Sequence, residues 1–183
     1  MTYTRKLIKV FLGIILYALG VVVTFEARIG FSPWEVFHAG LANVLHLQIG
    51  TVSIAVGLIL LLITTLCGEK TGIATILNIV FIGLFVNIIL GTKIIPTADS
   101  VPVSIIQMTI GLFIMVFATY LYISAGLGAG ARDGFMVLIY RKTGIKVGIV
   151  RSLIEVTVTI LGALMGGLFG WGTIIAAVFL GIA

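Results

Sequence analysis

The stretch Ala125-Gly-Leu-Gly-Ala-Gly-Ala-Arg-Asp-Gly134 decides how this chain folds. It ends a long apolar run with a group of glycines and then carries the Arg132–Asp133 pair into a short helical segment. An earlier stretch, Ala27-Arg-Ile-Gly-Phe-Ser-Pro-Trp-Glu35, has the same plan. Glycine allows the backbone conformations that a sharp turn after a helix requires. The two stretches therefore predict two equivalent breaks in a chain that is otherwise largely helical.

Shifting the sequence by 98 residues aligns the two breaks, and also much of the chain that follows them, without a gap. Identical residues then stand at Ala27 and Ala125, Gly30 and Gly128, Gly50 and Gly148, Leu66 and Leu164, Gly68 and Gly166, Gly72 and Gly170, Thr75 and Thr173, Ile76 and Ile174, Val80 and Val178, Phe81 and Phe179, and Gly83 and Gly181. This is about a dozen identities over about 57 positions, a pattern found in the internal repeats of many transporters. We interpret the chain as two repeats, about 7–91 and about 103–183, joined by the polar linker 92–102.

The composition predicts a membrane protein. Hydrophobic residues make up 61% of the chain and charged residues only 9%, whereas soluble domains carry about 25% charge. The lipid bilayer is therefore the expected surroundings. The net charge of +5 does not indicate nucleic-acid binding, because the basic residues are spread between apolar runs. The single cysteine, Cys67, excludes an internal disulfide and a thiolate metal cluster. We expect no cofactor.

Five apolar stretches reach the length of about 20 residues that a spanning helix needs. They cover about 7–26, 49–67, 72–91, 103–124 and 145–166. A sixth begins at Trp171, and the pattern predicts that it is truncated at Ala183. Two further helical segments, about 33–46 and 131–142, are too short and too polar to span comfortably. The predicted fold class is therefore an all-α polytopic membrane bundle, one domain over 1–183, with about six spanning helices and two short re-entrant or interfacial helices.

The basic residues test the orientation of the two repeats. If the short helices do not cross, each repeat has an odd number of spans, and the two copies are inverted. With the N-terminus in the cytoplasm, the outer side then receives only Arg28 and Lys93, and the other basic residues lie inside. If the short helices do cross, Lys70 and Arg132 move outside and Lys93 moves inside. This alternative fits the charges slightly less well and remains open.

The two glycine breaks are the candidate binding region. In inverted repeats they are expected to meet near a shared pocket, where the short helices would present free N–H groups. Such helix ends attract anionic groups, and Gly128 and Gly130 would let a substrate approach the backbone. The alternative is that these glycines only turn a tight connection at the membrane surface. Ser32, Pro33 and Glu35 have the spacing of a capping box at the start of the first short helix.

Acidic and basic side chains on the short helices have two interpretations each. Glu35 and Asp133 align with each other and serve either as a proton-relay or cation pair or as caps of their own helices. Arg132 is either an anchor for an anion or the partner of a neighbouring acid. Trp34 occupies the position equivalent to Arg132, where it lines a pocket or anchors the chain at the membrane interface. His38 follows Glu35 with the spacing of carboxylate di-metal bundles, but the further ligands are missing, so we expect no metal.

The fifth apolar stretch contains Arg151 and Glu155, four residues apart. Residues at this spacing lie on one helix face, so we expect them to pair with each other and to face the bundle interior or a water-filled cavity. Asn78, Asn87 and Gln107 are expected to form hydrogen bonds between helices rather than to bind a ligand.

Two signatures together, Gly30-Phe-Ser-Pro-Trp-Glu-Val-Phe-His38 and Gly126-Leu-Gly-Ala-Gly-Ala-Arg-Asp-Gly134, resemble the YczE-like family of bacterial membrane proteins, a group that includes the YyaS and YitT proteins. The segments Ile49-Gly-Thr-Val-Ser53 and Thr75-Ile-Leu-Asn78 are also similar to that family. The resemblance implies a multi-pass protein of the bacterial cytoplasmic membrane. Transport has been presumed for the family, and some members are linked to the production of lipopeptide antibiotics. The resemblance supplies no substrate and no catalytic residue.

The leading hypothesis is a small transporter, or a substrate-binding membrane subunit, with a site for an unidentified small molecule between the repeat halves. The alternative is an accessory or regulatory protein for a biosynthetic or transport complex, such as one that makes lipopeptides. An enzyme is not expected, because no arrangement of a nucleophile with its base appears in the sequence. Both a homo-oligomer and a complex with another membrane subunit remain open.

Overall fold

A computed structural model describes residues 3–69, 71–128 and 130–182. Three residues used above, Lys70, Ala129 and Ala183, lie outside this part of the chain. Within the described residues the chain forms eight helices and no strand. They are α1 (Tyr3–Glu26), α2 (Pro33–Leu45), α3 (Ile49–Leu66), α4 (Ile73–Thr92), α5 (Val101–Ser124), α6 (Ala131–Thr143), α7 (Val147–Leu164) and α8 (Trp171–Ile182).

The predicted helical membrane fold is confirmed. Helices α1, α3, α4, α5 and α7 are long and apolar enough to cross a membrane, and their bounds lie within a few residues of the predicted stretches. Helix α8 begins at Trp171, as predicted, and is apolar, with 12 described residues. Helices α2 and α6 have 13 residues each. At 1.5 Å per residue they are about 20 Å long, too short for a hydrocarbon core of about 30 Å.

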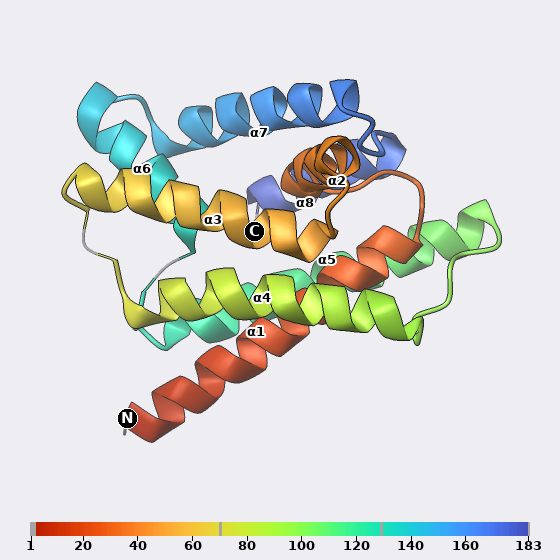
Figure 1. The fold of residues 1–183 in the computed structure, drawn as a ribbon, viewed down its shortest axis with the longest axis horizontal. Coiled ribbons are helices and arrows are strands. Elements are labelled where there is room, and N and C mark those ends of the chain that lie inside the picture. The colour runs from red at the N-terminus through yellow and green to blue at the C-terminus, as the bar shows by residue number, and fades with distance from the viewer. Residues whose placement is uncertain (1–2, 70, 129, 183) are drawn as a thin grey trace.

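The helices alternate in direction, and α2 and α6 run across the others (Figure 1). Helices α1, α4 and α7 run from left to right in that view, whereas α3, α5 and α8 run from right to left. Helix α2 connects the right-hand ends of α1 and α3, and α6 connects the left-hand ends of α5 and α7. The two short helices are therefore inserted at opposite ends of the bundle.

Glycines allow a close crossing of the antiparallel helices α1 and α5. A Cβ atom at Gly13 would lie 2.9 Å from the carbonyl oxygen of Ala118, and one at Gly20 would lie 2.9 Å from the carbonyl oxygen of Gly111. These distances leave no space for a side chain at either position. Small residues that let backbones approach are the usual means of helix association in membranes. The crossing lies at the centre of the largest cluster of buried side chains.

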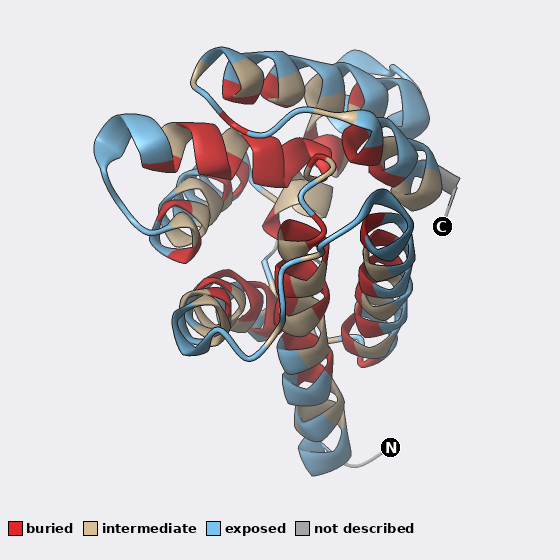
Figure 2. Ribbon diagram, turned by 90° about the vertical axis from the view of Figure 1, so that its right-hand side faces the viewer, coloured by how far each residue is buried: buried red, intermediate tan, exposed pale blue. Residues whose placement is uncertain are grey.

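The outer surface of the bundle is apolar. Large hydrophobic side chains such as Leu62, Ile106, Phe113 and Leu164 are exposed, and the exposed residues of the long helices face outward (Figure 2). A soluble protein of this size rarely exposes so much contiguous apolar surface. The surface is that of a protein in contact with the lipid bilayer.

The shift of 98 residues that aligns the sequence also relates the helices. The first three helices begin and end 98 residues before α5, α6 and α7, and α4 begins 98 residues before α8. Positive φ angles follow the same shift, since they occur at Arg28 and Gly126, Gly30 and Gly128, His46 and Gly144, and Gly68 and Gly166. The internal repeat itself stays a prediction, and these correspondences are used as its support below.

Candidate substrate site

The short helices begin as the sequence predicts, with one difference at the first. Ser32 is the N-cap of α2 and Pro33 takes the first helical position, but the Ser32 hydroxyl forms no cap hydrogen bond. The predicted capping box is therefore wrong. The Glu35 carboxylate, which would close that box, forms an ion pair with another helix instead. Gly130 is the N-cap of α6, as expected.

The ion pair joins the two short helices. Nη2 of Arg132 lies 3.2 Å from Oε1 of Glu35, whose side chain is only 4% exposed. The guanidinium of Arg132 also lies over the indole ring of Trp34, 4.9 Å from its centroid, which is within the range of a cation–π interaction. Of the two roles predicted for Arg132, the structure shows the one in which it is the partner of an acid. The positions equivalent under the shift of 98 residues, 34 and 132, are thus in direct contact.

A cavity of about 890 Å³ opens beside this ion pair, and residues from all eight helices line it. Of the residues predicted to bind substrate, the structure brings eight together in its wall: Ser32, Trp34, His38, Gly130, Arg132, Asp133, Arg151 and Glu155. Glu35 lies directly behind Arg132, to which it is bonded. Most of the predicted site therefore surrounds one cavity between the two halves of the chain.

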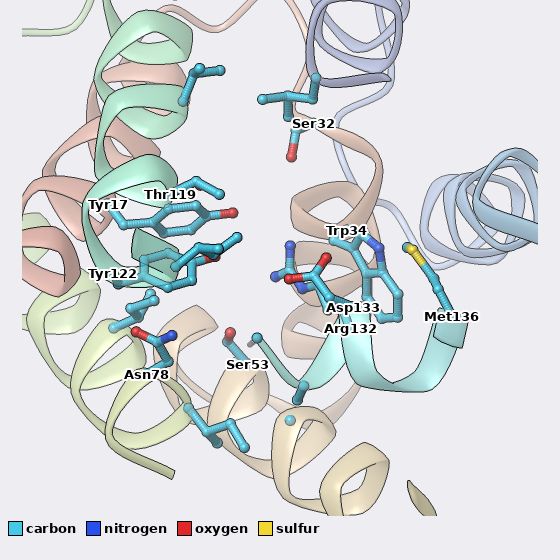
Figure 3. Close-up of a pocket in the computed structure, with 18 of the residues that line it drawn as sticks. Tyr17, Ser32, Trp34, Ser53, Asn78, Thr119, Tyr122, Arg132, Asp133 and Met136 are labelled. Carbon is cyan, nitrogen blue, oxygen red and sulfur yellow. The ribbon is translucent and has the colours of Figure 1, made fainter. Parts of the chain in front are cut away.

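Figure 3 shows how the walls face each other. Arg132 and Asp133 point across the cavity from α6, toward the rings of Tyr17 on α1 and Tyr122 on α5. These two rings pack edge to face with their centroids 6.4 Å apart. Asn78 on α4 lies below Tyr122 on the same side. One wall is thus charged, and the other is aromatic with an amide.

Several buried polar atoms around the cavity have no hydrogen-bond partner among the described residues. They are both side-chain atoms of Asn78, Nε1 of Trp34 and Oε2 of Glu35. Asn78 is only 4% exposed. A buried polar group without a partner costs about 1–3 kcal/mol, so such groups are rare unless water or a ligand completes them. Of these residues, Trp34 and Asn78 line the cavity, and Glu35 lies behind its wall.

Glu35 and Glu155 each form an ion pair at the cavity, whereas Asp133 forms none among the described residues. Within the described part of the chain, neither Arg132 nor Arg151 lies within 4.0 Å of its carboxylate, although both attract it from further away. Burial raises the pKa of the Asp133 carboxyl, and the two arginines and the backbone N–H of Gly130 only partly offset this. The cavity therefore contains one carboxylate that has no cation of its own.

A second ion pair lies further along the same cavity. Nε of Arg151 is 2.9 Å from Oε1 of Glu155, so the predicted pairing is confirmed. Arg151 also donates a hydrogen bond to the backbone carbonyl of Leu180 on α8. The equivalent positions in the first half, Ser53 and Gly57, line the cavity as well. Both halves thus present the same helix face to the cavity, but only the second half carries charges there.

His38 is a buried part of the wall. It is 3% exposed, and its ring lies 6.2 Å from the ring of Trp34, centroid to centroid. Burial lowers the pKa of the His38 imidazole, and the charge of Arg132 lowers it further, so the ring is neutral at pH 7. Among the described residues, no group of three or more His, Cys, Asp and Glu side chains is placed to hold a metal ion.

Gly128 does not line the cavity, although the sequence suggested a binding role for it. It has a φ of +137° and packs against the start of α4, where a Cβ atom would lie 2.8 Å from Oγ1 of Thr75. Gly30, its equivalent, has a φ of +121° and packs in the same way against Gly170 at the start of α8. These glycines fix the two breaks against the opposite half of the chain.

Among the wall residues that sequence reasoning missed are Asn78, Tyr17 and Tyr122. Asn78 was expected to bond between helices, as Asn87 does when its Oδ1 accepts a hydrogen bond from the Gly50 N–H at 2.8 Å. Asn78 instead has no partner among the described residues, so this expectation is wrong. Tyr17 and Tyr122 stand in apolar runs and looked like ordinary residues of a spanning helix. A polar residue in such a run is the only signal that the sequence offered.

The fold and the cavity define a helical membrane protein with several spans. Its family follows from a family model, described as a family of unknown function (DUF6198), that matches residues 4–183. The chain belongs to this family.

Two relatives cover nearly the whole chain. One is the uncharacterized membrane protein YczE of Bacillus subtilis (strain 168), 37% identical over 174 residues, which cover 94% of this chain and 80% of that protein. Another is an uncharacterized protein of Haemophilus influenzae, 34% identical over 175 residues, which cover 93% of this chain and 79% of that protein. No solved structure matches the chain. The resemblance to the YczE-like family is thereby confirmed.

Proposed function

We propose that this protein binds a small molecule in the cavity between two inverted repeats and carries it across the cytoplasmic membrane, either alone or as the substrate-binding subunit of a complex. The observation that carries the proposal is the cavity itself. It is formed by both halves of the chain, and it contains buried polar atoms that the described residues leave without partners. Transporters built from inverted repeats place their binding sites between the repeats in this manner.

Reciprocal contacts between the halves support the inverted repeats. The N–H of Gly172, at the start of α8, donates to the carbonyl oxygen of Ile29 at 2.8 Å. The N–H of Ala74, at the start of α4, donates to the carbonyl oxygen of Leu127 at 3.2 Å. Under the shift of 98 residues Ala74 is equivalent to Gly172, and Ile29 is equivalent to Leu127. The second bond is therefore the counterpart of the first with the two halves exchanged. Antiparallel packing of α1 on α5 has the same symmetry, because Gly13 is equivalent to Gly111 and Gly20 to Ala118.

The proposal is tested by access to the cavity from the two sides of the membrane. A single cysteine at the wall position Ser53, in a Cys67→Ser background, is treated with a membrane-impermeant maleimide in right-side-out and in inside-out vesicles. A transporter alternates the side on which its site is open, so Ser53→Cys should react in both preparations. Ser100→Cys and Thr143→Cys, which are exposed between long helices, serve as controls that should each react in only one.

Labelling of Ser53→Cys from a single side, or from neither, would contradict transport. The accessory role would then be favoured if a second membrane protein copurified in a fixed ratio. Vesicle labelling and copurification together separate a transporter from a regulatory subunit without knowledge of the substrate.

A further inference from the structure

The charges around the cavity do not balance, and this imbalance limits what the cavity can bind. Arg132 is paired with Glu35 at 3.2 Å, and Arg151 with Glu155 at 2.9 Å. Asp133 faces the cavity without an ion-pair partner in the described part of the chain. His38 adds no charge at neutral pH. The wall therefore has one unbalanced negative charge when Asp133 is ionised, and a bound cation would balance it.

An anionic substrate, which the helix N-termini suggest from sequence, fits the structure less well. The guanidinium of Arg132 is already occupied by Glu35 on one side and by the ring of Trp34 on its face. An anion would have to compete with Glu35 and would also approach Asp133. Like charges in a site of low dielectric repel strongly, so the ionised wall discriminates against anions.

The opposite wall has the groups that recognise an organic ammonium ion. Asn78 lines the cavity, is 4% exposed, and has an Oδ1 without a donor among the described residues, so it can accept an N–H bond. Tyr17 and Tyr122 extend from that wall toward Asp133, with their hydroxyl ends leading (Figure 3). A phenol oxygen accepts hydrogen bonds, so these hydroxyl groups can also accept an N–H bond from the substrate. The buried apolar part of the lining, which includes Ile79 and Leu60, suits a hydrocarbon body.

Resting on the function proposed above, we infer that the substrate is a small protonated amine with an apolar or aromatic body. Its ammonium group pairs with the Asp133 carboxylate, and its body extends across the cavity toward Asn78 and the hydroxyl groups of Tyr17 and Tyr122. The free Nδ2 of Asn78 donates to a hydroxyl or carbonyl oxygen of the substrate or to a water beside it. Arg132 acts as a positioning residue, because its pairing with Glu35 fixes the start of α6 from which Asp133 projects.

Four probes of similar shape test this inference on the full chain purified in detergent, with binding measured by titration calorimetry. They are 2-phenylethylammonium, its trimethylated form, the neutral 2-phenylethanol and the anionic 3-phenylpropionate. We expect 2-phenylethylammonium to bind at least about tenfold more tightly than the alcohol and the carboxylate, since charge-assisted hydrogen bonds are the strongest of their kind. The trimethylated ion has no N–H donor, so it should bind more weakly than the primary amine.

Tighter binding of 3-phenylpropionate, or equal binding of the alcohol and the amine, would overturn the inference. If the trimethylated ion bound as tightly as the amine, an N–H hydrogen bond would be excluded from the inference, and recognition by charge alone would remain. Absence of binding by all four probes would also count against the inference, because the cavity is large enough for each of them. None of these results depends on transport.

A matched pair of variants locates the site. Asp133→Asn should weaken 2-phenylethylammonium binding at least about tenfold, whereas Asp99→Asn, the same change in an exposed position of the linker, should leave it unchanged. Equal affinity in Asp133→Asn and the unchanged chain would contradict the role of Asp133. If Asp133→Asn fails to fold, the four probes on the unchanged chain still decide the question.

The two proposals fail in distinguishable ways. If Ser53→Cys is labelled from both sides of the membrane but the amine does not bind preferentially, the protein is a transporter of another substrate class. Amine binding with labelling from one side only would leave an ammonium-binding membrane protein that does not transport.

Discussion

At the scale of single residues, the ion pair between Glu35 and Arg132 positions the charged wall of the cavity. It fixes the start of α6 against α2 and uses the positive charge that would otherwise be available to a substrate. Removing one partner of a buried pair leaves the other charge without compensation, which costs about 3–5 kcal/mol when both are fully buried. Here the Arg132 side chain is 26% exposed, so water compensates part of the loss.

We therefore expect Glu35→Gln to lower the free energy of unfolding by about 1–3 kcal/mol. The matched control is Glu69→Gln, which breaks the pair with Arg141, whose side chain is 65% exposed. Exposed pairs contribute about 0–1 kcal/mol. Thermal unfolding of both variants in the same detergent measures the difference, and an equal loss in the two would contradict a structural role of the Glu35–Arg132 pair.

Residue pairs show which part of the site could be predicted from the sequence. Arg151 and Glu155 were predicted to pair because four residues form one helical turn, and they do. The pairing of Glu35 with Arg132 depends instead on how two helices far apart in the chain pack together. The same holds for Asn78, whose lack of a partner depends on the space left by its neighbours. Contacts within one helix could be predicted from the sequence, whereas contacts between distant helices could not.

At the scale of helices, apolar run length and glycine breaks determine the architecture. A spanning helix must satisfy all its backbone groups internally, so its ends fall where the apolar run ends. For this reason the helix bounds were predicted to within a few residues. What the sequence did not show is where the glycines act. Gly13 and Gly20 lie inside an apolar helix, and only the structure shows that they bring α1 and α5 together.

Alanine substitutions separate the packing role of a glycine from its effect on the helix. Alanine favours a helix over glycine by about 0.5–1 kcal/mol, so Gly148→Ala, with no atom within 4 Å of the new methyl group, should stabilise the protein or leave it unchanged. Gly13→Ala would place its methyl group 2.9 Å from the carbonyl oxygen of Ala118. We expect it to destabilise the protein by about 1–3 kcal/mol, as overpacked interiors do.

Thermal unfolding of the two variants measures this difference. A stabilising Gly13→Ala would show that α1 and α5 are not in the close contact described here. The opposite signs expected for one chemical change make the comparison independent of the detergent used.

At the scale of the whole molecule, the contacts between the two halves are those that exchange of the predicted repeats would produce. Helices α4 and α8 each begin against the glycine break of the other half, and the two short helices meet near their N-terminal ends, where Arg132 pairs with Glu35. The sequence predicted the equivalence because identical residues keep their register over the aligned region. It could not predict that equivalent positions 34 and 132 touch, since contact across a symmetry axis leaves no signal in the spacing.

The orientation of the two halves predicts which loops lie on the outer side of the membrane. Single cysteines replace Arg28, Gln48 and Ser100, which are exposed between helices, and Thr143, which is exposed at the end of α6, in a Cys67→Ser background in intact cells. Because α1 and α3 run in opposite directions and α2 joins their adjacent ends (Figure 1), positions 28 and 48 should lie on the same side. With the N-terminus inside, as the basic residues favour, an impermeant thiol reagent should label positions 28, 48 and 100 and leave position 143 protected until the cells are opened.

Labelling at 28 with protection at 48 and 100 would mean that α2 crosses the membrane, and the two halves would then be parallel. The cavity between them would still exist, but inversion of the repeats could not be the means by which it opens to both sides.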